Sequence, residues 1–96
     1  MTKEIGFKNR DRLLELGIKI GLVRRMRGMS QEQLAERADI SRTYLSMIEA
    51  PNTVCSFTLD VLYNIADALG MDAAELLKMK LPDITKSEQM QHGADD

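Results

Sequence analysis

The stretch SQEQLAERADISRTYLSMIE, residues 30–49, decides the fold. Apolar residues recur at helical spacing in two groups, and Asp39 separates the groups. The side chains that this spacing directs to a shared core are Leu34, Ala35, Ala38, Ile40, Leu45 and Ile48. Ser30 and Gln33 have the spacing of a capping box, and Ser41 is placed to cap a second helix. The stretch therefore predicts two short helices, which end near Ala38 and Glu49.

The turn between these helices carries a further signal. Two helices that cross steeply after a short turn need a small residue at the crossing, and Ala35 stands there. Asp39 occupies the turn, and aspartate is one of the few residues that enter the left-handed region at low cost. The pattern predicts a helix-turn-helix. An ordinary helical hairpin shares the apolar spacing and stays open as an alternative.

The flanking sequence predicts three more helices. Residues 10–27 repeat apolar side chains at helical spacing and end with a cluster of arginines before Gly28. Thr58 opens a helix that Gly70 ends, and Asp72 with Glu75 opens a short last one over DAAELLK. The sequence shows no strand pattern and no repeat. We expect an all-α domain of about five helices over residues 10–81, between an N-terminal arm (1–9) and a polar tail (82–96).

Charge is distributed unevenly along the chain. The 96 residues carry a net charge of -2, yet residues 1–28 hold eight basic and three acidic side chains, a balance of +5. A local field steers a ligand more than net charge does, so the acidic average does not exclude nucleic acid. Apolar runs are too short for a membrane span, and the charged N-terminus is not a secretory signal.

At this point the chain resembles the Cro/C1-type (XRE-type) helix-turn-helix regulators of bacteria and phages. The resemblance runs over LGIKIGLVRRMRGMSQEQLAERADISRTYLSMIE and resumes at TLDVLYNIADALGMDAAELL, about two-thirds of the chain. It implies a compact five-helix lambda-repressor-like domain that binds double-stranded DNA, most often as a dimer on a partly palindromic operator.

The resemblance also assigns residues. The recognition helix would be residues 41–49, with Arg42, Thr43 and Met47 facing base edges. Arginine matches the O6 and N7 atoms of guanine, and threonine can contact a thymine methyl group. Arg24 and Glu49 match a structural pair between the first helix and the end of the recognition helix. The expected contacts to DNA phosphates come from Ser30, Gln31, Ser41, Tyr44, Ser46 and Asn52.

The loop after the recognition helix departs from the family. Most members have glycine and a basic residue here, whereas residues 50–59 carry no charge. Asn52, Thr53 or backbone N–H groups are candidates to replace the missing cation. A basic N-terminal arm could contact DNA in place of this loop, or the same residues could form a solvated terminus; both interpretations stay open for Lys3, Lys8, Arg10 and Arg12.

Other chemistry finds little support in the sequence. Cys55 is alone, which fits a reducing cytoplasm, and a partly buried small residue is favoured over a redox-sensing thiol. His92 has no cysteine or second histidine at ligand spacing, so we expect no metal and no cofactor. No catalytic group or phosphate-binding glycine loop is recognisable, so an enzyme is disfavoured.

The expected function is therefore transcriptional regulation, and a repressor is the commonest role in this family. Alternatives are an antitoxin or a restriction-modification controller with the same domain, and a protein-interaction module that has lost DNA binding. A homodimer is expected because the last helix and its exit carry an apolar group beyond the small core: Leu76, Leu77, Met79 and Leu81.

Overall fold

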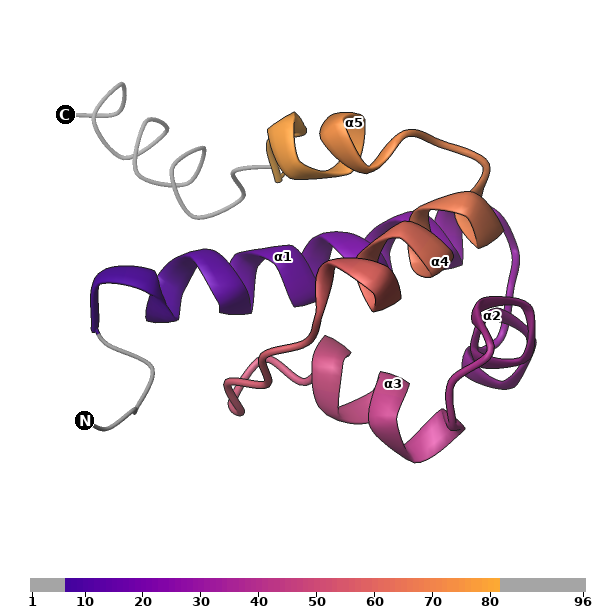
Figure 1. Cartoon of the computed structure of the whole chain (residues 1–96), viewed down its shortest axis with the longest axis horizontal. Coiled ribbons are helices and arrows are strands. Elements are labelled where there is room, and N and C mark those ends of the chain that lie inside the picture. Colours follow the sequence, from indigo (N-terminus) through magenta and orange to yellow (C-terminus); the bar gives the residue numbers. More distant parts are fainter. Residues whose placement is uncertain (1–6, 82–96) are drawn as a thin grey trace, which may run out of the picture.

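The computed structural model describes residues 7–81, and within that range it contains helices and no strand (Figure 1). The elements are α1 (Phe7–Met26), α2 (Gln31–Ala38), α3 (Arg42–Glu49), α4 (Leu59–Leu69) and α5 (Ala73–Lys78). This confirms the predicted all-α, five-helix fold. Most of the predicted arm and the whole predicted tail, residues 1–6 and 82–96, lie outside the described residues.

The helix boundaries follow the predicted caps. Ser30 Oγ accepts the Gln33 N–H at 3.0 Å, and Gln33 Oε1 accepts the Ser30 N–H at 2.9 Å, which completes the capping box. Ser41 and Thr58 accept N–H groups in the first turns of α3 and α4. Gly70 ends α4 with a positive φ of 75°. Each of these boundaries is fixed by residues close in sequence, which is why the sequence predicted them.

The first helix is longer than predicted. It begins at Phe7 rather than near Arg10, because the residues between Gly6 and Gly17 include no helix breaker. Arg10 and Arg12 therefore lie on the exposed first turns of a helix. Among the helices of residues 7–81, none combines the length and the apolar character that crossing a bilayer requires.

The core lies where all five helices meet. Every helix contributes to the largest of its fully buried side chains, which are Ile20, Leu34, Leu45, Ile65, Leu69 and Leu76. α2 packs on α3 and α4, and α1 packs on α3, α4 and α5. In Figure 1, α3 and α5 lie on opposite sides of the pair formed by α1 and α4. The face of α3 that points away from this pair is thus left open to solvent.

Candidate functional site

The turn between α2 and α3 has the predicted geometry. Asp39 is the only residue other than glycine with a positive φ in the described chain, at φ 61° and ψ 42°. Ala35 is 3% exposed, and its carbonyl oxygen accepts the Ile40 N–H at 3.0 Å. Leu34, Ala38, Leu45 and Ile48 are buried as predicted, and Ile40 is half-buried against them. Two short helices are therefore joined by a left-handed residue and share one core face.

α3 has one buried and one exposed face. Leu45, Ile48 and Glu49 are buried. The opposite side presents four exposed side chains of mixed chemistry: Arg42, Thr43, Ser46 and Met47. Met47 is 46% exposed, so it adds an apolar side chain to this otherwise polar face. The three residues predicted to read bases therefore share one solvent-facing surface.

The backbone of α1 forms the seat for the C-terminal end of α3. A Cβ atom at Gly17 would collide with the carbonyl oxygen of Ile48, and one at Gly21 would lie 3.0 Å from Glu49 Oε1. Both glycines weaken α1 by helix propensity, at roughly 1 kcal/mol each relative to alanine. Close packing explains Gly17, because only a residue without a side chain lets the backbone of α3 approach this near, whereas Gly21 borders the end of the Glu49 side chain.

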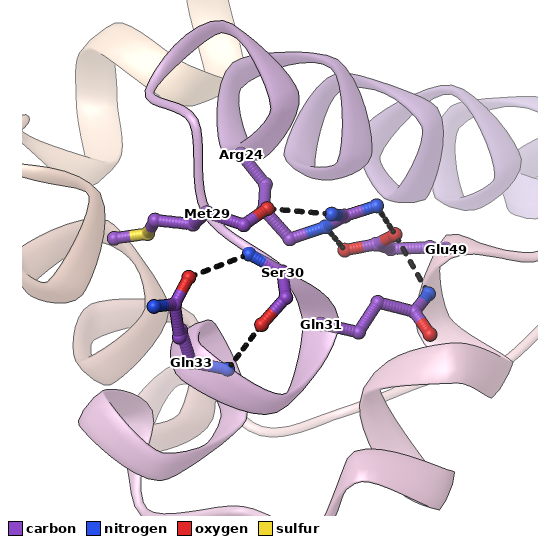
Figure 2. A network of polar contacts seen from close by, with 6 residues as sticks. All are labelled: Arg24, Met29, Ser30, Gln31, Gln33 and Glu49. Carbon is purple, nitrogen blue, oxygen red and sulfur yellow. Dashed lines mark hydrogen bonds and ion pairs between the residues drawn. The ribbon is translucent and has the colours of Figure 1, made fainter.

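Glu49 and Arg24 form a buried ion pair at this seat. Arg24 Nε donates to Glu49 Oε2 at 2.9 Å, and Arg24 Nη2 donates to Glu49 Oε1 at 3.0 Å. Arg24 Nη1 also donates to the carbonyl oxygen of Met29 at 2.8 Å, just before α2. The pair expected from the family resemblance thus joins the end of α1, the start of α2 and the end of α3 (Figure 2).

Gln31 joins the same network. It is the first residue of α2, it is half-buried, and its Nε2 donates to Glu49 Oε1 at 3.0 Å (Figure 2). This contact was not predicted, since the two residues are 18 positions apart and glutamine shows no pairing signal in sequence. Gln31 also lines an open hollow between α2 and α3, together with Arg24, Ser30, Glu32 and Arg42.

The hollow between α2 and α3 offers several hydrogen-bond donors. The first N–H groups of any helix lack intrahelical partners, and the partial positive charge of the helix start attracts anions. Ser30 Oγ uses a lone pair to accept the Gln33 N–H, so its own O–H is still available to donate. Arg42 adds a full positive charge at the exposed start of α3. These donors and Arg42 favour an anionic ligand, whereas the carboxylate of Glu32, which also lines the hollow, opposes one.

The loop after α3 owes its apolar composition to packing. Cys55 and Phe57 pack half-buried against the core, whereas Asn52 and Thr53 are exposed. Burial raises the pKa of the Cys55 thiol. The pKa of Tyr44 is also raised, mainly by burial and to a smaller extent by the charge of the nearby Cys55. A raised pKa lowers the thiolate fraction, which agrees with the prediction of a partly buried small residue rather than a reactive thiol.

Two basic side chains hold the last helices in place. Lys19 is only 6% exposed, and its Nζ donates to the carbonyl oxygen of Leu77 in α5 at 3.0 Å. Arg27 Nε donates to the carbonyl oxygen of Leu69 at the end of α4 at 2.9 Å. Cations stabilise helix C-termini. The burial of Lys19 was not predicted, although its helical spacing from Leu16 and Val23 places it on the buried face of α1.

The predicted C-terminal apolar patch is partly wrong. Leu76 is fully buried and Met79 is half-buried against the core, because α5 turns this face toward α1 and α4. Leu77 is 51% exposed as predicted, and Leu81 is half-buried. Beside Leu77, α4 exposes Leu59 and Tyr63. These three residues surround a shallow hollow between α4 and α5. In residues 7–81 no group of three or more potential metal-ligating side chains comes together.

Comparisons with known proteins agree with this geometry. A family model described as "Helix-turn-helix domain" matches residues 17–81. A similar solved structure is the clp gene regulator ClgR from Corynebacterium glutamicum, with 26% identity, a TM-score of 0.63 and coverage of 88% of this chain and 83% of that one. Another is the hypothetical transcription factor NHTF from Neisseria, with 29% identity, a TM-score of 0.62 and coverage of 93% and 95%. No curated protein matches the chain.

Proposed function

The chain belongs to the helix-turn-helix domain family, and from that premise we propose that it is a sequence-specific DNA-binding transcriptional regulator that acts without catalysis. The observation that carries the proposal is the two-sided α3. Its inner face is locked to α1 and the core, and its outer face presents Arg42, Thr43 and Met47. A rigid helix with a free face of mixed polar and apolar side chains suits the major groove, where bases offer acceptors and methyl groups.

The proposed contacts divide into two classes. Arg42, Thr43 and Met47 read bases. Six residues contact phosphates, which fix register but carry no sequence information. They lie around the start of α2, along α3 and in the loop after it: Ser30, Gln31, Ser41, Tyr44, Ser46 and Asn52. The two similar solved structures are a clp gene regulator and a hypothetical transcription factor, which supports this role. We further propose that the protein acts in the cytoplasm and that it represses transcription.

The test begins with the unknown operator. The protein is incubated with fragmented genomic DNA, and the retained fragments are sequenced to find the operator. Arg42→Ala and Gln31→Ala are then titrated against the operator and a scrambled duplex at one salt concentration. Arg42→Ala should lose about 1 to 3 kcal/mol on the operator alone, whereas Gln31→Ala should weaken both duplexes similarly.

Arg37→Ala is the matched control for charge. Arg37 is also exposed and lies in the last turn of α2, so its loss removes the same charge outside the hollow. Equal losses for Arg42→Ala on both duplexes would show that Arg42 contacts phosphate and would overturn the base-reading assignment. Absence of any salt-dependent binding to duplex DNA would favour a protein-interaction module instead.

A homodimer is part of the same proposal, and the exposed apolar face of Leu59, Tyr63 and Leu77 supports it. Two copies related by a twofold axis would bind half-sites about one DNA turn apart, roughly 34 Å. We expect sedimentation at tens of micromolar to give a dimer mass, and Tyr63→Lys to give a monomer that footprints single half-sites. A monomeric wild-type protein would contradict the dimer.

A further inference from the structure

Glu49 lies at the point where three helices exchange hydrogen bonds. Its two carboxylate oxygens accept Arg24 Nε, Arg24 Nη2 and Gln31 Nε2, all within 3.0 Å. The Glu49 side chain is 6% exposed, so it is too deep to reach a DNA backbone itself. Gln31 is half-buried and lines the hollow between α2 and α3. Glu49 is therefore a buried hydrogen-bond partner of Gln31, and Gln31 itself reaches the solvent.

The chemistry of the carboxylate fixes the orientation of the Gln31 amide. A glutamine amide can present either its NH₂ group or its oxygen to a neighbour, but an ionised carboxylate only accepts hydrogen bonds. The nitrogen must consequently face Glu49, as Figure 2 shows, and one amide N–H hydrogen is left for another acceptor. Without this anchor the side chain would rotate among several rotamers at the surface.

We propose that Glu49 is a positioning residue for DNA binding: it holds the Gln31 amide so that its second N–H is directed to a DNA phosphate. The inference rests on the proposed function and extends it to a buried residue that touches no DNA. Arg24 neutralises the Glu49 charge, so that this carboxylate can lie behind a phosphate-binding surface without repelling it.

The direction in which a Glu49 substitution changes DNA affinity separates the positioning role from a purely electrostatic role and from a purely structural role. Removing a negative charge near DNA should strengthen binding by electrostatics alone. A purely structural role would leave the affinity of the folded protein unchanged. Positioning of Gln31 predicts the opposite of the electrostatic effect. The amide introduced by Glu49→Gln accepts hydrogen bonds more weakly than the carboxylate and can turn its own NH₂ group toward Gln31, so the Gln31 amide is no longer held in one orientation. We expect Glu49→Gln to weaken binding to a random-sequence duplex about three- to tenfold, which is the range for one hydrogen bond.

The experiment is a double-variant cycle with Gln31→Ala, Glu49→Gln and the combination, measured by titration of a random-sequence duplex. Denaturation curves set a temperature at which each variant is folded. Gln31→Ala alone should also lose three- to tenfold, and adding Glu49→Gln should then cost less than about twofold. Glu36→Gln is the matched control, since Glu36 is exposed on α2 and its change removes the same charge. It should bind as tightly as wild type or more tightly.

Defined outcomes overturn the inference. Additive losses, or an affinity of Glu49→Gln equal to or above wild type, would show that Glu49 does not act through Gln31. If Glu49→Gln does not fold, the cycle is run with Glu49→Asp, which keeps the charge beside Arg24 but withdraws the carboxylate from Gln31. If the wild-type protein shows no salt-dependent binding to duplex DNA, the proposed function itself is wrong. This result differs from additive losses in the two variants, which contradict only the role of Glu49.

Discussion

The two ends of α3 are held by different means. At the N-terminal end, Ser41 Oγ accepts the Tyr44 N–H at 3.0 Å, and Asp39 makes the turn. Residues within a few positions therefore hold this end of the helix. At the C-terminal end, Ala50 adopts extended backbone, and α1 provides the support through Gly17 and Arg24. The exposed end is fixed locally and the buried end by tertiary contacts, and substitutions at the two ends should therefore differ in severity.

The largest effect is expected at the buried end, from Glu49→Ala. The substitution leaves the buried guanidinium of Arg24 without its partner, and breaking a buried pair in this way costs about 3 to 5 kcal/mol of unfolding free energy. Urea denaturation of wild type and variant measures the loss. Glu36→Ala, at an exposed site on α2, should stay within about 0.5 kcal/mol. Similar midpoints for both variants would mean that the ion pair does not secure α3.

An intermediate effect is expected from Gly17→Ala, with Gly21→Ala as its matched comparison. The new methyl group at position 17 meets the Ile48 carbonyl oxygen, which cannot move without shifting α3, and overpacking costs about 1 to 3 kcal/mol. At position 21 the nearest atom is the end of the Glu49 side chain, and better helix propensity offsets the crowding. Thermal melts should rank Gly17→Ala well below Gly21→Ala. The reverse order would place the close approach of α1 and α3 elsewhere.

The smallest of the three effects is expected at the exposed end, from Ser41→Ala. Loss of an N-cap costs about 1 kcal/mol, and Ser41→Asp should restore most of it because aspartate caps equally well. Ser46→Ala is the control, since Ser46 is exposed within the same helix and caps nothing. Denaturation midpoints measured for all three variants test whether the start of α3 depends on local capping. If Ser41→Ala lowers the free energy of unfolding as much as Glu49→Ala does, the two ends of α3 do not differ in how much they contribute to stability.

Residues near one another in sequence determined most of the fold. The capping box of Ser30 and Gln33, the left-handed turn at Asp39 and the glycine end of α4 at Gly70 each require only neighbours within a few positions. The apolar spacing of α2 and α3 was likewise sufficient to identify their buried face. Helix caps and periodicity are local physics, so the sequence predicts them well.

Only the tertiary structure decided which surfaces these helices share. It buried Leu76 and exposed Leu77, because the approach of α5 to α1 selects one of two adjacent apolar residues. It also gave the uncharged loop its role as a cover for the core, and it brought Gln31 to Glu49 across 18 positions. Periodicity fixes the face of a helix but not its partner, since the partner depends on how whole elements pack. The sequence alone thus determined the helix-turn-helix and its caps, whereas packing determined which elements cover its buried faces.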